Sequence, residues 1–542
     1  MPLTRAALLF ALTLAAASLT AHAQTMPTLQ VYSRETIVDV LVTDKDGHPV
    51  HNLKPSDFTV TEDGKPQPIR SFLETSKDIP LSTEASVSLR KLPPNTYTNL
   101  QSASATGPLD IFLFDNINDG GNSFVVHKED IPDLLKRLPA GTQVAVMGLA
   151  SRLTVIQSPT SDPSLLPKGL TTVLDPYVVI GDSCTVLREH IYATLRQLNQ
   201  IADYLSGLKG RKNLIWIGRQ PSFLVFPNGC VDATQDIRLT YDHLAEAQVA
   251  IDPLDPHGLA APIVTPGGPI TGNTGAQVAT ATMGVQMDIA TDHLTMEAIA
   301  EATGGLAFYN NNDRIGLIVQ AIDNGSSYYT LSYAPRIAAY DGKLHSIHIT
   351  VSKPGVHLVY RTAYSAENTQ SASADSATSK QMPTAMAQGA PPATQLLFDV
   401  RIQPSIAPPD PFDPPILGAL NPKLKSQHLT RYELLYAVPA SQIAFTQATD
   451  GTYTGSLEFD VAAYDIDGCL VTLRSQTMRL PLTTDEYQQF LQTPFKFFQQ
   501  LDLPPGQLFL RTGVKDAVSN KLGTLEVPIT PAKNMPPPEA GQ

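Results

Sequence analysis

The sequence predicts an α/β protein: a doubly wound, mostly parallel sheet flanked by a small N-terminal β domain and a C-terminal all-β sandwich. Residues 109–115 form a largely apolar run of strand length that ends on Asp115, as in a central parallel strand. Strand and helix patterns alternate from there to residue 365. Strand patterns dominate residues 28–75 and 395–530, which predicts the two flanking β domains.

The first 23 residues have the features of a secretory signal peptide. Arg5 precedes an apolar run from Ala6 to Leu19, and Ala21 and Ala23 give the small-x-small form that signal peptidase cuts. The run is too short to serve as a transmembrane segment, and no second apolar stretch of spanning length follows. We therefore expect cleavage after Ala23 and a secreted or periplasmic protein.

Length and composition narrow the class of protein further. The 542 residues are too many for one core and predict two to four domains. The formal net charge of −13 argues against a nucleic-acid partner, because nucleic-acid binding depends on basic patches. Three cysteines are too few for a disulfide scaffold.

The N-terminal β domain is predicted from alternating apolar residues and two Asp-Gly hairpin signals, at Asp46 and Asp63. Residues 76–108 are polar, contain proline and lack periodicity, so we interpret them as a connection between domains.

The α/β domain is assigned to residues 109–365. Its most regular helix runs from Leu187 to Leu208, where leucine and isoleucine recur at spacings of three and four. Residues 143–149, 213–218 and 249–254 have the apolar character of buried strands.

Residues 366–394 are rich in Ala, Ser, Thr, Gln and Pro, which predicts a flexible linker. Residues 395–530 return to strand patterns and predict an immunoglobulin-type sandwich, with one helix-like stretch from Tyr487 to Phe498. Residues 531–542 are interpreted as a disordered tail.

Several motifs together resemble one family. They are Val42 to Val50, Leu53 to Lys65, Phe112 to Asn118, Gly210 to Trp216, Val249 to Gly258, Ala300 to Gly305 and Tyr328 to Tyr333. In order and spacing they resemble the bacterial secreted proteins with a VWFA-related domain, that is, a von Willebrand factor type A-like domain. The resemblance covers residues 30–365 and implies a ligand face at the carboxyl ends of the strands.

In the wider family that face carries a metal-ion-dependent adhesion site, with Asp-x-Ser-x-Ser after the first strand, a Thr before a central helix and an Asp after the next strand. Hard cations such as Mg²⁺ need such oxygen ligands. Here Asp115 matches the first Asp and Thr185 stands for the Thr, but Ile117 and Gly218 replace ligands.

Asp119 takes the place of the second Ser and still offers oxygen. The resemblance therefore implies a degenerate site, for which two interpretations stay open. Asp115, Asp119 and Thr185 hold Mg²⁺ or another divalent cation, or no cofactor binds and Asp115 caps the next turn. The second is favoured, because only two of the ligand positions match by residue type.

Under the same fold assignment, Cys184 and Cys230 lie in loops at the same end of the sheet as Asp115. An oxidising compartment would permit a disulfide between them. Either such a bridge or two free thiols is compatible with the sequence.

No nucleophile elbow, zinc-protease motif, P-loop or dinucleotide fingerprint is present, so we do not expect an enzyme. Two functions remain. The first is an adhesion-type module that binds a protein partner at the strand-tip face of the VWFA-like domain. The alternative is a metal-free structural or assembly protein of the cell envelope, with the C-terminal sandwich as its main contact.

Overall fold

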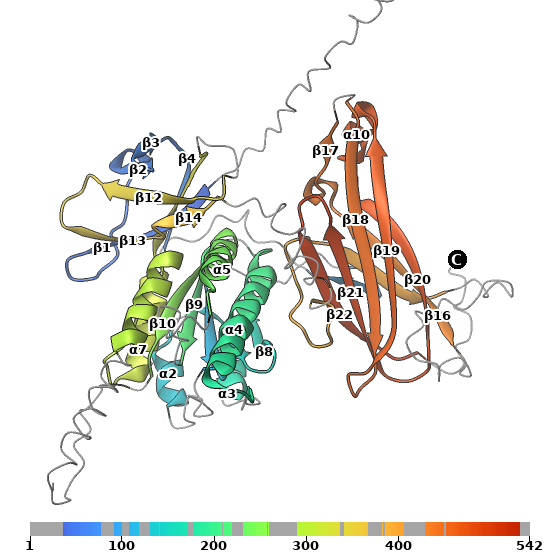
Figure 1. Cartoon of the computed structure of the whole chain (residues 1–542), viewed down its shortest axis with the longest axis horizontal. Helices are drawn as coiled ribbons and strands as arrows, with labels where there is room; N and C mark the ends of the chain where they lie inside the picture. The colour runs from blue at the N-terminus through green and yellow to red at the C-terminus, as the bar shows by residue number, and fades with distance from the viewer. Residues whose placement is uncertain are drawn as a thin grey trace, which may run out of the picture.

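The structure is a computed structural model (Figure 1). It describes residues 36–76, 92–99, 108–118, 130–139, 141–170, 177–208, 210–218, 231–256, 258, 290–335, 341–366, 382, 385–405, 429–448 and 451–531. The predicted signal peptide, Asp119, Cys230 and residues 532–542 of the predicted tail lie outside this set. Within it, no helix is both long and apolar enough to cross a membrane.

The central sheet is mostly parallel, as predicted. Its order is β10-β9-β6-β7-β8, and only β8 runs antiparallel to its neighbour. A parallel bridge between Leu254 and Phe308 extends it beyond β10. The strands are β6 (Leu109–Asp115), β7 (Gln143–Leu149), β8 (Thr154–Thr160), β9 (Lys212–Ile217) and β10 (Val249–Leu254).

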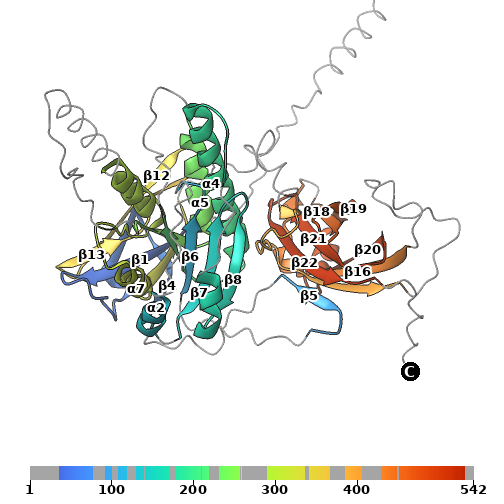
Figure 2. The ribbon, with the colours of Figure 1, turned by 90° about the horizontal axis from the view of Figure 1, so that it is seen from below.

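Helices cover both faces of this sheet (Figure 2). Successive strand residues alternate between the two cores: Ile111 and Trp216 point to one, and Phe112 and Ile215 to the other. The first core is closed by α4 (Ser183–Leu205), α5 (Thr234–Glu246) and the helical residues 290–303. The second is closed by α2 (Ile131–Arg137), α3 (Leu166–Leu170) and α7 (Arg314–Gly325).

The N-terminal β body contains more of the chain than the sequence predicted. Two four-stranded sheets, β13-β1-β11-β4 and β14-β12-β2-β3, enclose one apolar core. Its strands are β1 (Thr36–Asp44), β2 (Phe58–Glu62), β3 (Lys65–Gln67), β4 (Ile69–Thr75), β11 (Tyr328–Tyr333), β12 (Leu344–Val351), β13 (Val356–Val359) and β14 (Ala363–Ser365). The prediction that residues 109–365 form one α/β unit is therefore wrong beyond Tyr328, because the chain returns there to pair with strands nearly 300 positions earlier.

The C-terminal body consists of two antiparallel sheets around one core. One has the order β20-β16-β15-β5, and the other contains β17, β18, β21 and β22, with β19 on the second edge of β18. The elements are β15 (Asp399–Pro404), β16 (Thr430–Val438), β17 (Thr446–Gln447), β18 (Tyr453–Tyr464), β19 (Leu470–Leu482), α10 (Thr484–Phe490), β20 (Phe495–Leu503), β21 (Leu508–Asp516) and β22 (Leu522–Ile529).

Three predictions about this body need correction: the helix-like stretch, the connection 76–108 and the linker 366–394. The helix-like stretch ends at Phe490, and Phe495 and Phe497 face the core from β20 as alternate residues of a strand. The connection 76–108 contributes β5 (Thr96–Thr98), which pairs with β15 (Figure 2).

The described part of the predicted linker is packed against the C-terminal body. Met382, Met386 and Ala393 are buried against Leu522. Buried Arg511 donates to the carbonyl oxygens of Ala385, Ala390 and Pro391. Small and polar composition was therefore misleading here, because backbone carbonyls of this segment satisfy a buried guanidinium.

Candidate functional site

The candidate site lies where β6 and β9 end side by side at the centre of the sheet. Ligands of open α/β sheets bind beyond the carboxyl ends of strands, at the point where the strand order reverses. From β6 the chain proceeds to β7 on one side, and β9 and β10 add on the other. Asp115 ends β6 and Gly218 follows β9, so both stand at this reversal point.

Asp115 is 2% exposed, and both of its carboxylate oxygens are already used. Oδ1 accepts hydrogen bonds from the backbone N–H groups of Ile117 (2.9 Å) and Asn118 (3.0 Å). Oδ2 accepts from Asn118 Nδ2 (2.8 Å) and from Trp216 Nε1 (3.0 Å). Burial raises the pKa of Asp115 to about 6, against the opposing effect of these donors.

The two replaced ligand positions serve packing. Ile117 is buried in the core that α4 covers. Gly218 has a φ of 136°, and a Cβ at this position would lie 3.0 Å from the Cβ of Asp115. The space in which the adhesion pattern places an Asp is therefore filled by Asp115 itself.

Thr185 is not brought to Asp115. Its backbone N–H donates to Asp182 Oδ1 (2.7 Å), which caps α4. The contact from α4 to the Asp115 turn comes from Thr194, whose Oγ1 accepts from Asn118 Nδ2 (3.2 Å). Thr194 lies nine positions after Thr185 in α4, a rise of about 13.5 Å along the helix.

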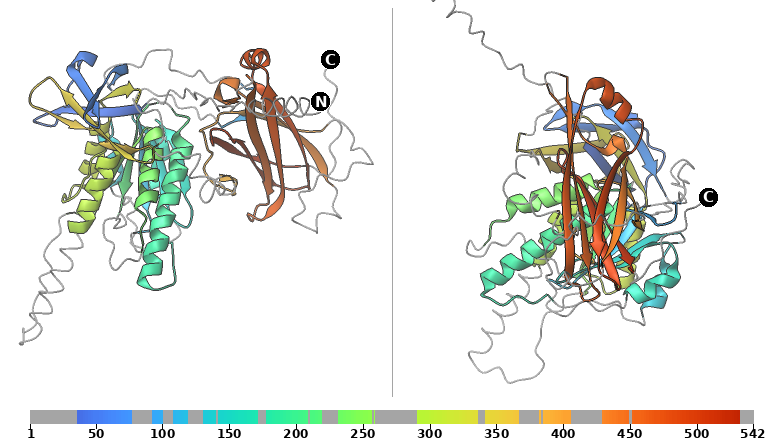
Figure 3. Two further views of the ribbon diagram at one scale, coloured as in Figure 1. Left: turned by 45° about the horizontal axis from the view of Figure 1, so that its top comes forward. Right: turned by 90° about the vertical axis from the view of Figure 1, so that its right-hand side faces the viewer.

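Thr185 lies away from Asp115 because α4 is longer than the strands that it covers. Its 23 residues span about 34 Å, whereas the six residues of β9 span about 20 Å. The first turns of α4 therefore extend beyond the strand tips (Figure 3).

The described residues at this position do not fit a hexacoordinate cation. Asp115 is saturated by internal donors, Ile117 and Gly218 offer no ligating side chain, and Thr185 is remote. Elsewhere in the described chain, no group of three or more His, Cys, Asp and Glu side chains could hold a metal ion. Asp119, the third residue predicted for the metal, lies outside the described residues.

Cys184 lies in the first turn of α4, not in a loop, and it is disulfide-bonded. Cys469 is a free, exposed thiol. Cys230, the partner expected from the sequence, lies outside the described residues, so the pairing itself stays a prediction.

Two apolar side chains just before α4 are strongly exposed. Val178 is 73% and Ile180 is 94% exposed. We call these two residues the tip patch, because they precede the end of α4 that extends beyond the strand tips. The ring of Tyr177 lies 5.6 Å from that of His190, which connects this segment to α4.

A second polar cluster, at the amino ends of β9 and β6, was missed by the sequence analysis. Arg211 donates to Asn213 Oδ1 (2.8 Å) and to the carbonyl of Gly304 (2.9 Å), and its backbone N–H donates to the Tyr328 hydroxyl (3.2 Å). Asn213 Nδ2 in turn donates to Asp110 Oδ1 (2.8 Å). All these groups are buried.

Apart from Asp110, these residues come from three of the motifs that carry the family resemblance. The motifs therefore converge on a buried junction between the α/β sheet and β11, where Arg211 joins β9, residues 303–305 and Tyr328. Gly305 is required there, since a Cβ would lie 1.9 Å from the Ile251 carbonyl oxygen. Motif spacing was the available signal, but it does not reveal which motifs meet in space.

No protein-family model matches the chain. No curated protein matches it either.

Among solved structures, the chain is similar to an aerotolerance-related membrane protein from Bacteroides fragilis, at 14% identity and a TM-score of 0.22, over 40% of this chain and 99% of that one. It is also similar to BatB from Bacteroides thetaiotaomicron, at 16% identity and a TM-score of 0.22, over 40% of this chain and 97% of that one. A third similar structure is a von Willebrand factor type A protein from Catenulispora acidiphila, at 7% identity and a TM-score of 0.25, over 54% of this chain and 73% of that one. These scores are too low to identify the fold or the function of this chain.

Proposed function

We propose that this protein is a non-enzymatic, extracytoplasmic binding module whose VWFA-like domain captures a protein partner at the strand-tip face without a metal ion. The observation that carries this proposal is the tip patch. Val178 and Ile180 are large aliphatic side chains exposed to solvent beside a long helix. Covering such side chains with a partner is favourable, because it removes apolar surface from water.

The disulfide at Cys184 supports the extracytoplasmic setting. Disulfides persist in oxidising compartments and are rare in the cytosol. The bond also lies only a few residues from the tip patch, where a covalent link restrains the end of α4 and lowers the entropy that partner binding would cost.

The hydrogen bonds of Asp115 support metal-independent binding. A cation at this carboxylate would have to displace donors that are otherwise buried, and unsatisfied buried donors cost roughly 1–3 kcal/mol each. The adhesion chemistry implied by the resemblance is thus replaced, in this proposal, by apolar contact.

The test is cross-linked capture from the native cell envelope with the full chain and matched variants. We expect one set of partners to be recovered with the wild type and with Leu344→Asp, an exposed leucine of β12. The double variant Val178→Asp/Ile180→Asp should lose this set, and a chelator should leave it unchanged. Capture that survives the double variant, or that the chelator abolishes, contradicts the proposal.

One observation favours the alternative of a structural or assembly protein. Leu435 on β16 and Phe498 on β20 are directly opposed across the strands and are 39% and 50% exposed. Such a pair on the outer face of the C-terminal body offers a second apolar contact. Loss of the captured partners in Leu435→Asp/Phe498→Asp, but not in the tip-patch variant, would make this body the main contact.

A further inference from the structure

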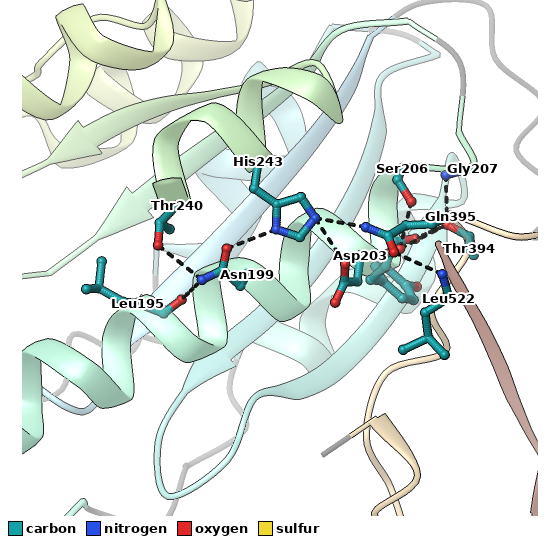
Figure 4. Close-up of polar contacts among 11 residues, drawn as sticks. Leu195, Asn199, Asp203, Ser206, Gly207, Thr240, His243, Thr394, Gln395 and Leu522 are labelled. Carbon is teal, nitrogen blue, oxygen red and sulfur yellow. Dashed lines mark hydrogen bonds and ion pairs between the residues drawn. The ribbon is translucent and has the colours of Figure 1, made fainter. Parts of the chain in front are cut away.

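The end of α4 is hydrogen-bonded to the segment that leads into the C-terminal body (Figure 4). The Thr394 backbone N–H donates to the Asp203 carbonyl (2.9 Å), and its Oγ1 donates to the Tyr204 carbonyl (2.8 Å). Thr394 also forms an antiparallel bridge with Gly523 of β22. This segment therefore connects the α/β domain to the C-terminal body.

His243 of α5 lies beside this connection, and its Nδ1 faces an acceptor. Asn199 Nδ2 donates to the Leu195 carbonyl (3.0 Å) and to Thr240 Oγ1 (3.0 Å), so the amide cannot be turned without facing a carbonyl with its own oxygen. Asn199 Oδ1 is consequently the atom that lies 2.9 Å from His243 Nδ1. A hydrogen must sit on Nδ1 in every protonation state.

The other ring nitrogen faces a donor and an acceptor at once. Gln395 Oε1 accepts from the Leu522 N–H (3.1 Å), which turns the Gln395 Nε2 donor toward His243 Nε2 (2.9 Å). Asp203 Oδ1 lies 3.1 Å from the same Nε2. That oxygen is buried and has no other hydrogen-bond partner among the described residues.

Neither protonation state satisfies both neighbours. Neutral His243 accepts at Nε2 from Gln395 but turns a lone pair toward the Asp203 carboxylate. Protonated His243 donates to Asp203, and its N–H then faces the N–H of Gln395. One contact must weaken whenever the other forms.

We infer that His243 is a pH-sensitive latch between the α/β domain and the C-terminal body. When neutral, it holds Gln395 and with it the 393–396 segment. When protonated, it transfers its hydrogen bond to Asp203 within the α/β domain and releases Gln395. Acidification of the surroundings thereby loosens the C-terminal body, a function beyond the binding proposed above.

The charged groups around His243 favour its protonated form. Burial lowers its pKa, but the Asp203 carboxylate of α4 and then Glu246 of α5 raise it, and the pKa ends above its ordinary value. Asp242 of α5 is turned to the Ser365 N–H (2.9 Å). The C-terminal body presents the neutral amide of Gln395.

The first test measures amide hydrogen exchange of residues 393–396 in the full chain at pH values on either side of the His243 titration. After correction for the intrinsic pH dependence, we expect about fivefold faster exchange on the acidic side, as for the loss of one hydrogen bond. His243→Gln should abolish this step. His345→Gln, which removes another histidine paired with carboxylates, should retain it.

The second test follows the His243 resonance by NMR in the folded chain, so it does not depend on the first variant. Gln395→Leu should raise the pKa of His243 by roughly half a unit or more, because the neutral form loses its donor. Asp203→Asn should lower it. An unchanged pKa in Gln395→Leu, or a step that persists in His243→Gln, would overturn the latch.

Discussion

Trp216 donates its indole N–H to Oδ2 of Asp115 at 3.0 Å, and both residues are buried. The bond joins the ends of β9 and β6 at the point where α/β folds bind their ligands. Together with the donors of Ile117 and Asn118, it makes Asp115 the cap of a turn, which is the interpretation that the sequence favoured over metal binding.

Removing this carboxylate should cost stability whether or not a cation is present. Asp115→Ala leaves four donors without an acceptor, and we expect a loss of roughly 2–4 kcal/mol in the free energy of unfolding. Denaturant titration with and without millimolar Mg²⁺ measures it. Thr185→Ala, at the exposed end of α4, is the control and should change stability by less than about 1 kcal/mol. A Mg²⁺-dependent gain in the wild type that Asp115→Ala loses would contradict this assignment.

Restoring the missing acidic ligand should not restore a metal site. Gly218→Asp places a Cβ 3.0 Å from that of Asp115 at a φ of 136°, which side chains rarely adopt. We expect destabilisation of roughly 1–3 kcal/mol and no calorimetric heat on Mg²⁺ addition. Gly141→Asp, at a positive φ but in open space, separates backbone strain from the clash. Saturable Mg²⁺ binding by Gly218→Asp would show that the site needs only this one ligand.

The strands of the central sheet could be predicted because each is a local pattern. The predicted strands 143–149 and 249–254 coincide with β7 and β10. The partners of strands could not be predicted in the same way. Nothing within residues 96–98 indicates that β5 pairs with β15, some 300 positions later. The donor set of Asp115 was hidden for the same reason, since Trp216 reaches it from another strand.

Buried charged side chains show a second limit of sequence reasoning. Arg511 and Arg211 are 1% and 2% exposed, although arginine ordinarily predicts a surface. Each donates to a backbone carbonyl oxygen of a distant segment, that of Gly304 for Arg211 and that of Pro391 for Arg511. Only the fold brings those acceptors together, so neither the packed 385–394 segment nor the Arg211 junction follows from composition.

Asp110 should make the protein less stable as the pH rises. Burial raises its pKa to about 8, and the nearby Asp252 adds to this effect against the Asn213 donor. The folded state keeps a proton that the unfolded state loses above about pH 4, so stability falls between about pH 4 and pH 8. Asp110→Asn should therefore gain stability over the wild type, by a margin that grows across this interval. Chemical denaturation at both ends of the interval measures it, and a constant margin would contradict the expectation.

His345 should have the opposite dependence. It is buried between Asp63 (2.7 Å) and Asp341 (3.1 Å). Burial lowers its pKa, but these carboxylates raise it above the ordinary value. The stabilisation is thus complete below the unfolded pKa and disappears as the pH rises through the folded one. His345→Gln should lose roughly 1–2 kcal/mol at pH 5.5 and less at pH 8.5. His348→Gln, on the exposed face of β12, should lose little at either pH.

Arg511 should hold the 385–394 segment against the C-terminal body. Its guanidinium donates to three backbone carbonyls of that segment, and each would lose a charged donor in Arg511→Met. We expect a loss of roughly 2–4 kcal/mol and proteolytic cleavage within residues 385–394. Limited proteolysis with mass spectrometry locates the cleavage. Arg401→Met, on the exposed face of β15, is the matched control and should leave the segment protected. Equal protection in both variants would mean that apolar packing of Met386 and Ala393 alone fixes the segment.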